Sequence, residues 1–172
     1  HWRRRTLVRT RCRVTLHVGS HEVRLVIGGA VMILGFSEVE RRVKELFPFQ
    51  RPYKIGAASA DVRVGCNLQR ENGETPTWFL RTTRQNPYML QPGEFVLVDM
   101  WEWVKLPLDL SASFTLKSSR ARAGYQHAVA GWVDPGWDGI LTMELKNNNQ
   151  HTSLPIYPGM PMGQLIFMQT ID

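Results

Sequence analysis

The sequence contains little that would support a disulfide framework, a metal centre or a membrane span. Cysteine occurs twice in 172 residues, at Cys12 and Cys66, and the two residues form neither a zinc-binding nor a redox motif. Such low cysteine usage fits a reducing compartment, and we expect the protein in the cytoplasm. The sequence has no run of 18 or more apolar residues, so we expect no transmembrane helix and no membrane partner.

Negative charge is scarce in the first part of the chain. Residues 1–31 hold seven Arg and one Glu, a net charge of +6, whereas residues 32–172 hold 14 Lys and Arg against 14 Asp and Glu. The high pI therefore comes from residues 1–31. A nucleic-acid-binding domain usually carries its own basic excess, and so we expect no nucleic acid partner. For residues 1–31 alone, a basic arm that contacts polyanions is the alternative.

The chain divides into two parts at Met32. Residues 1–31 lack the apolar core and the small cleavage residues of a signal peptide. We interpret them as an unstructured leader or as upstream or fusion sequence; a transit peptide fits less well because Ser is scarce. Residues 32–172 are long enough for one domain with a hydrophobic core.

A short helix is predicted near the start of this domain. The sequence Ser37-Glu38-Val39-Glu40 has the form of a capping box, which predicts a helix that begins just after Ser37. Val39, Val43 and Leu46 follow at helical spacing, and Pro48 ends the helix. From Tyr53 onward the chain consists of short alternating segments separated by Pro and Gly. This order predicts a mainly β fold, either a barrel or a sandwich.

Residues 117–144 concentrate the polar chemistry of the chain. Lys117, Ser118, Ser119, Arg120 and Arg122 offer ammonium, hydroxyl and guanidinium donors, which together suit a phosphate chain. A turn at 134–139 follows, and then an alternating strand that carries one acid, Glu144. Taken singly, each part could be a solvated loop, a plain turn or an exposed strand.

The order of these parts resembles the dCTP deaminase branch of the dUTP pyrophosphatase superfamily. The resemblance covers roughly residues 32–172 and includes Ser59-x-Asp61-Val62-Arg63-x-Gly65 and Pro92-Gly93-Glu94. The longer motifs are Ser118-Ser119-x-Ala121-Arg122-x-Gly124, Ala130-Gly131-x-x-Asp134-Pro135-Gly136-Trp137-x-Gly139, Thr142-x-Glu144-Leu145-x-Asn147 and Leu154-Pro155-x-x-x-Pro158-Gly159-Met160-x-x-Gly163-Gln164-Leu165. Such a series is far more specific than one short motif.

The resemblance implies a fold, an assembly and an activity. The fold is a distorted, jelly-roll-like β-barrel of the dUTPase type with a short N-terminal helix. The assembly is a homotrimer with nucleotide sites between subunits. The activity is hydrolytic deamination of dCTP to dUTP and ammonia. Members of the family commonly continue in a C-terminal arm that closes over the nucleotide, and the sequence ends at Asp172 without one.

The resemblance also assigns catalytic roles. Glu144 is the general base that takes a proton from water, a role worth about 10²–10⁴-fold in rate. Ser118 and the backbone carbonyl of Ala130 place the water, and Arg122 lies near the same centre. Zinc-dependent cytidine deaminases instead carry H-x-E and P-C-x-x-C motifs, which this sequence lacks. We therefore expect no zinc, and we expect Mg²⁺ to be bound with the triphosphate.

Substrate-binding residues are assigned in the same way. They are Lys117, Ser118, Ser119, Arg120, Ala121, Arg122, Asp134, Thr142, Met143, Glu144 and Gln164. Asp134 matches the acid that contacts the sugar 3′-hydroxyl, and in pyrophosphatases the same acid helps to activate water. Lys117 replaces a usual Arg, Arg120 a usual Leu and Val129 a common Thr. Trp132 and Trp137 are expected to serve packing.

Two alternatives to a simple dCTP deaminase stay open. A bifunctional enzyme would also cleave dUTP to dUMP and pyrophosphate, and Asp134 is compatible with that reaction. A non-catalytic nucleotide-binding relative would bind the same nucleotides without turnover. The substitutions at Lys117 and Val129 and the absent arm keep the second alternative open.

Overall fold

The computed structural model describes residues 12–18, 21–27, 32–128 and 130–170. The chain separates into two compact units, His1–Val31 and Met32–Asp172. In the first unit, β1 (Cys12–Val18) pairs antiparallel with β2 (His21–Ile27), Cys12 opposite Ile27. The described part of residues 1–31 is therefore a two-stranded hairpin and not the unstructured segment that we considered. Its origin as upstream or fusion sequence stays a prediction.

The second unit begins with helix α1 (Phe36–Leu46), whose buried face follows the predicted spacing of Val39, Val43 and Leu46. The predicted start of this helix was wrong. The N-cap is Gly35, whose carbonyl oxygen accepts hydrogen bonds from the backbone N–H groups of Glu38 and Val39, both 3.1 Å long. Ser37 lies within the first turn, and no side chain caps the helix.

Strands make up most of the rest of this unit, as predicted. They are β3 (Lys54–Ile55), β4 (Ala60–Arg70), β5 (Tyr88–Leu90), β6 (Phe95–Lys105), β7 (Leu110–Leu116), β8 (Tyr125–His127), β9 (Trp132–Val133), β10 (Asp138–Asn147), β11 (Leu154–Ile156) and β12 (Pro161–Gln169). Two short helical segments, η1 (Thr77–Arg81) and α2 (Ser118–Ala123), interrupt them. No helix among the described residues is long and apolar enough to cross a membrane.

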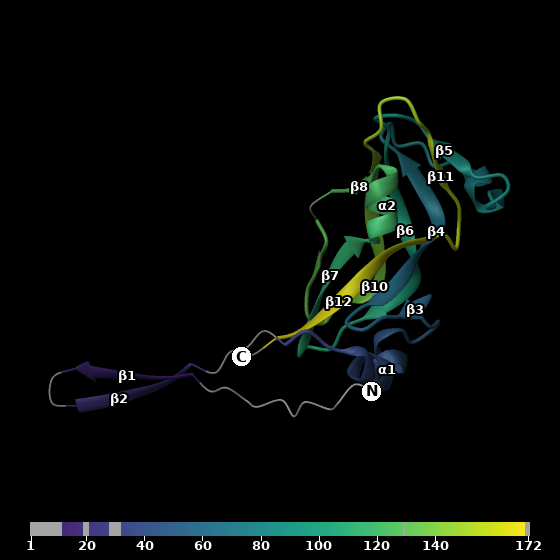
Figure 1. Cartoon of the computed structure of the whole chain (residues 1–172). Coiled ribbons are helices and arrows are strands. Elements are labelled where there is room, and N and C mark those ends of the chain that lie inside the picture. The colour runs from purple at the N-terminus through teal and green to yellow at the C-terminus, as the bar shows by residue number, and fades with distance from the viewer. Residues whose placement is uncertain (1–11, 19–20, 28–31, 129, 171–172) are drawn as a thin grey trace, which may run out of the picture. The chain divides into compact units, whose positions relative to one another are not determined.

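The strands form one large curled sheet and a small one (Figure 1). Within the described residues, the large sheet has eight strands in the order β8-β10-β6-β4-β12-β7-β9, with β3 added to β4. The small sheet pairs β11 with β5. The prediction of a mainly β, distorted barrel with a short N-terminal helix is confirmed. All strand pairs are antiparallel, so each strand can present one face to the interior and one outward.

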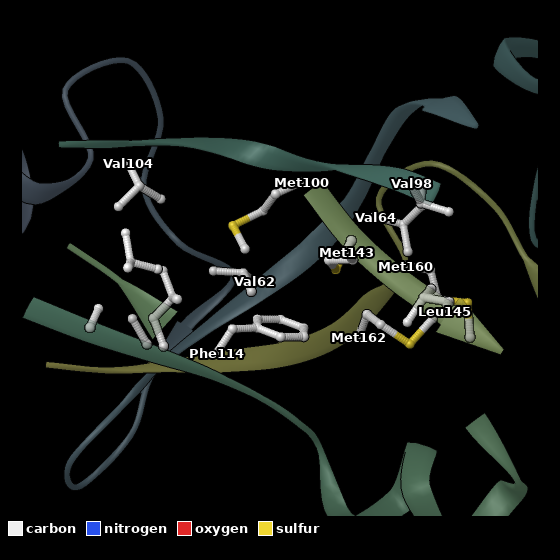
Figure 2. Close-up of a cluster of buried hydrophobic side chains, with 14 of the residues drawn as sticks. Val62, Val64, Val98, Met100, Val104, Phe114, Met143, Leu145, Met160 and Met162 are labelled. Carbon is white, nitrogen blue, oxygen red and sulfur yellow. The ribbon is translucent and has the colours of Figure 1, made fainter. Parts of the chain in front are cut away.

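The interior of the curled sheet is filled by side chains from its strands and from the loop before β12 (Figure 2). The labelled residues are Val62, Val64, Val98, Met100, Val104, Phe114, Met143, Leu145, Met160 and Met162, and all are buried. Each fully buried side chain of this kind stabilises the fold by roughly 1.5–3 kcal/mol. Because β10 contributes Met143 and Leu145 to this interior, the alternating residues Thr142 and Glu144 take the opposite face of the strand.

Candidate active site

The helix α2 carries most of the predicted phosphate-binding residues and starts directly after β7. Lys117 is its N-cap residue, and Ser118 and Ser119 lie exposed in its first turn. Gly124 ends the helix with φ = 106°, a conformation that favours glycine. A Cβ at Gly124 would also lie 2.4 Å from the amide of Asn149, so the end of the helix depends on this glycine.

Lys117 is held by two contacts to neighbouring strands. Its backbone N–H donates to the carbonyl of Met162 at 3.0 Å, and its ammonium forms an ion pair with the carboxylate of Asp61 on β4. The Asp61 side chain is almost fully buried, which strengthens the pair relative to one in water. Asp61 was missed as a site residue, although the family motif at 59–65 contains it.

Gln164 lies beside this ion pair. On β12, Gln164 stands opposite Asp61 of β4 and Thr115 of β7. The hydroxyl of Ser59 donates to its Oε1 at 3.2 Å, and its Nε2 donates to Thr115 Oγ1 at 3.4 Å. The structure therefore brings the predicted residues Lys117 and Gln164 together, with Asp61 between them. We call Ser59, Asp61, Thr115, Lys117 and Gln164 the phosphate-side cluster.

The remaining polar residues of α2 differ in their surroundings. Ala121 and Arg122 are exposed, and Arg122 forms no ion pair with any other described residue. Arg120 is half-buried, and its Nε donates to the carbonyl of Pro161 at 2.8 Å. Arg122 is thus available to an anion, whereas Arg120 is tied to the start of β12.

Glu144 lies half-buried on the outward face of β10, two residues after the exposed Thr142. Met143, between them, points into the core (Figure 2). Met143 could therefore contact a substrate through its backbone, and its side chain is not available for binding. The pairing of β10 with β6 shifts register between Ile140 and Thr142, a type of irregularity that often re-aims side chains at a site.

Strand β8 brings a histidine next to Glu144. His127 stands opposite Leu145, and the N–H of Ala128 donates to the Glu144 carbonyl at 3.1 Å. Burial lowers the pKa of His127, and the nearby charge of the Glu144 carboxylate opposes this shift. The His127 ring packs edge-on against Phe114, with 4.6 Å between ring centroids. A neutral imidazole therefore borders the predicted general base at neutral pH.

The segment that carries Ala130 passes close to β7. The Phe114 N–H donates to the Gly131 carbonyl at 2.7 Å, and a Cβ at Gly131 would lie 2.6 Å from the Phe114 carbonyl oxygen. Only glycine allows this approach. Ala130 is exposed at this point, whereas Val129 lies outside the described residues.

Asp134 is exposed at the turn that follows β9. The indole N–H of Trp132 donates to its Oδ1 at 2.9 Å. Trp132 was expected to serve packing, but within this chain the residue is 59% exposed and is bonded to a candidate site residue. Asp134 lies two residues after Trp132 and just beyond the end of β9, so the two side chains are close in sequence as well as in space.

The contacts of the predicted site residues fall into two sets. Among the described residues, no side-chain hydrogen bond or ion pair joins the phosphate-side cluster to Glu144 or Asp134. We call Trp132, Asp134, Thr142 and Glu144 the base-side group. The described residues also contain no cluster of three or more His, Cys, Asp or Glu side chains that could hold a metal ion.

Comparison with known proteins identifies the family. The model of dCTP deaminase-like domains matches residues 33–170. The chain belongs to the dCTP deaminase-like family. Among solved structures, the 2′-deoxycytidine 5′-triphosphate deaminase from Agrobacterium tumefaciens aligns with 81% of this chain and 48% of its own, with a TM-score of 0.66 and 19% identity, which shows a shared fold.

Two curated members of the dCTP deaminase-like family are more similar in sequence. A "dCTP deaminase, dUMP-forming" of Acidothermus cellulolyticus is 43% identical over 138 residues, 72% of this chain and 70% of the relative. A protein of the same name from Nanoarchaeum equitans is 44% identical over 82 residues, 47% of this chain and 41% of the relative. The chain therefore spans less than half the length of this second relative.

Proposed function

We propose that the protein deaminates dCTP and cleaves the product, so that dCTP and two waters give dUMP, pyrophosphate and ammonia. The observation that carries this proposal is the half-buried Glu144 carboxylate on β10, which borders a neutral His127 and shares its segment with Asp134. The sequence alone favoured dUTP as the product and kept dUMP as the alternative. The names of the relatives, which are dUMP-forming, favour that alternative.

In the first step, Glu144 takes a proton from a water molecule as the water oxygen bonds to C4 of cytosine. The proton passes to the exocyclic amino group, the C4–N4 bond breaks and ammonia leaves. The hydroxyl of Ser118 and the carbonyl of Ala130 hold the water, and Arg122 stabilises negative charge that develops nearby. A carboxylate suits this role because it can accept the proton and then return it.

In the second step, Asp134 activates another water for attack on the α-phosphorus. The bond between the α-phosphorus and the bridging oxygen breaks, and pyrophosphate leaves with the electron pair. Ser119, Arg122 and Gln164 hold the phosphate oxygens. Lys117 contributes once its ion pair with Asp61 rearranges toward the nucleotide.

Mg²⁺ accompanies the triphosphate in this proposal and neutralises part of its charge. Mg²⁺ prefers oxygen ligands and often keeps several waters, so phosphate oxygens of the substrate and water molecules can supply most of its ligands. Asp61 is the buried carboxylate of the phosphate-side cluster, and it could contribute one oxygen. Removal of Mg²⁺ with EDTA should weaken dCTP binding, whereas a zinc-selective chelator should leave turnover unchanged.

A homotrimer would complete the site. The phosphate-side cluster and the base-side group are not joined within one chain, and we propose that each active site combines the first from one copy with the second from another. Exposed aromatic side chains on the domain support an assembly, among them Phe49, Trp101 and Trp132. Multi-angle light scattering should give a mass three times 19.8 kDa. A monomer at micromolar concentration would count against this assembly.

The proposed function is tested by incubating the protein with dCTP and Mg²⁺ and resolving dUTP, dUMP, pyrophosphate and ammonia. We expect ammonia and pyrophosphate in equal amounts, with dUMP as the final nucleotide. Accumulation of dUTP would support the simple deaminase. Binding of dCTP without ammonia would support the non-catalytic alternative. We expect this chemistry in the cytoplasm, where it would control deoxynucleotide supply.

A further inference from the structure

A second groove lies beside α2 and uses side chains that the proposed mechanism leaves without a role. It is an open surface groove with a volume of about 420 Å³. Its lining includes Tyr53, Arg84, Arg120, Pro155, Tyr157 and Met160. Ligand sites for small molecules are commonly about 300–1,000 Å³ in volume, so the groove is large enough for one. We call it the two-arginine groove.

The two-arginine groove is positively charged. Arg84 and Arg120 both line it, and its lining contains no carboxylate. Neither arginine forms an ion pair with another residue in the described part of the chain. Two guanidinium groups without a counter-charge favour a ligand that carries at least two negative charges, such as a phosphate group.

Arg120 is already fixed in place. Its Nε donates to the Pro161 carbonyl at 2.8 Å, and this bond leaves the terminal N–H groups of the guanidinium for other partners. Burial raises the pKa of Tyr125 to about 12 and the charge of Arg120 opposes the shift, so this guanidinium lies close to the Tyr125 hydroxyl. A donor that is fixed before binding loses less conformational entropy when a ligand arrives.

The uncharged part of the lining suits an aromatic ring. Tyr53 is exposed, Tyr157 is half-buried, and Met160 is buried. Tyrosine faces stack on nucleobases with little dependence on the identity of the base. Ser118, Ser119, Gln164 and Glu144 are absent from this lining, so the groove is separate from the proposed active site.

We propose that the two-arginine groove is a second nucleotide-binding site, in which Arg84 and Arg120 hold the phosphate and a tyrosine ring contacts the base. This assignment gives a role to Arg120, which stands where the family usually has Leu. It does not depend on the proposed catalytic reaction, because no residue that has a step in that reaction lines the groove. The resemblance assigned Arg120 to substrate binding, whereas in the structure its side chain lines this groove.

The test counts nucleotide sites by isothermal titration calorimetry on the full chain, with dUMP as the probe. Wild type should bind two dUMP per chain. The double variant Ser119→Ala/Gln164→Ala should bind one, since it keeps the two-arginine groove. In that background, Arg84→Ala should weaken the remaining site by about tenfold or more, because a charge-assisted hydrogen bond is lost. Arg120→Leu should have a similar effect.

Arg81→Ala is the matched control. Arg81 lies three residues from Arg84 in the sequence and is exposed, but it does not line the groove. Its replacement removes the same charge and should leave dUMP binding within about twofold of the background. Arg84→Ala and Arg81→Ala should keep the wild-type melting temperature, since both residues are exposed and contribute little to the core.

Two further probes define the ligand. Deoxyuridine, which lacks the phosphate, should bind at least tenfold more weakly, and Tyr53→Ala/Tyr157→Ala should weaken dUMP more than inorganic pyrophosphate. Pyrophosphate that binds as tightly as dUMP, with no effect of the tyrosine replacements, would overturn the assignment of a nucleotide. Loss of all dUMP binding in Ser119→Ala/Gln164→Ala, or a remaining site that is unchanged by Arg84→Ala and Arg120→Leu, would overturn the site itself. A single wild-type site that survives Ser119→Ala/Gln164→Ala and is weakened by Arg84→Ala would support the groove and count against the proposed active site.

Discussion

The indole Nε1 of Trp132 lies 2.9 Å from Oδ1 of Asp134 and donates a hydrogen bond to it. Both side chains are exposed, so this bond and not the core fixes the direction of the carboxylate. A carboxylate that activates water must point at the reacting centre, and a misplaced one loses rate steeply. Trp132 therefore acts as a positioning residue for the proposed second step.

Trp132→Phe tests this relationship. The change keeps an aromatic ring and removes the donor, and a hydrogen bond to a charged group is worth about 1.5–3 kcal/mol, or roughly tenfold or more in rate. We expect pyrophosphate release from dUTP to fall through kcat, while ammonia release from dCTP is unchanged. Trp137→Phe is the control. The Trp137 indole donates to the backbone carbonyl of Gly139 at 3.2 Å, so this change removes an indole donor without removing a bond to a candidate site carboxylate. Equal losses in both reactions would show a structural role instead.

Glu144→Gln tests the proposed first step. Glutamine keeps the shape of the side chain and one hydrogen bond but cannot accept a proton from water. Ammonia release should fall by at least about 10²-fold, while the dissociation constant for dCTP stays close to that of wild type. Asp134→Asn should instead stop pyrophosphate release. Wild-type deamination by the Glu144→Gln protein would exclude Glu144 as the base.

A buried ion pair between β4 and β6 predicts a large effect on stability. Glu102 is 0% exposed and accepts hydrogen bonds from the backbone N–H of Arg63 at 2.9 Å and from its Nε at 2.7 Å. Removing one partner of a buried pair typically costs about 3–5 kcal/mol. We expect Arg63→Ala to lower the free energy of unfolding in urea by about that amount. Arg41→Ala, which breaks an exposed pair with Glu38, should leave the free energy of unfolding nearly unchanged.

The loss in Arg63→Ala should also depend on pH. Burial raises the pKa of Glu102, and the hydrogen bonds and charge of Arg63 oppose this shift. Without the guanidinium, the pKa of Glu102 in the folded state should rise further. At pH values between the unfolded and the folded pKa, Glu102 is then protonated in the folded state and ionised in the unfolded state. Stability from such a group is present at low pH and is lost as pH rises through the folded pKa. The variant should therefore be less impaired at pH 5 than at pH 8.

His127 should make stability fall on the acidic side of neutrality. Burial lowers the pKa of His127, so between its ordinary value of about 6.5 and the lowered value the unfolded state binds more protons than the folded one. As pH falls across that window, the free energy of unfolding should decrease. Below the lowered pKa, His127 is protonated in both states and should cause no further decrease. His127→Gln should remove this part of the pH dependence in urea titrations. An unchanged slope would mean that His127 does not titrate in this range.

The fold was largely predictable because its signals are local. The spacing of Val39, Val43 and Leu46 gave the buried face of α1, and Pro and Gly marked the turns between strands. The start of α1 was not predictable in this way. The Phe36 N–H donates to the carbonyl of Ala57 at 2.8 Å, and this contact with a distant residue fixes the first turn in place of the Ser37 cap.

The sequence predicted which residues belong to the candidate site better than it predicted the contacts between them. Alternation along β10 predicts that Thr142 and Glu144 share a face, as the structure places them. The ion pair of Lys117 with Asp61 joins residues 56 positions apart, and no local pattern encodes such a pairing. Chain topology sets this pairing. Asp61 lies on β4, Lys117 directly follows β7, and β12 lies between these two strands in the sheet.

The loop after β10 has a consequence for how the protein loses its structure. The Asn147 amide donates to the carbonyls of Leu90 and Thr152 at 2.9 and 2.8 Å, and its Oδ1 accepts from the Asn149 N–H at 2.9 Å. Asn149 in turn donates to the Ala123 carbonyl at the end of α2. Loop and helix should therefore open as one cooperative unit, with matched amide hydrogen-exchange rates. On mild warming, local opening of this unit would disorder α2 well before the barrel unfolds.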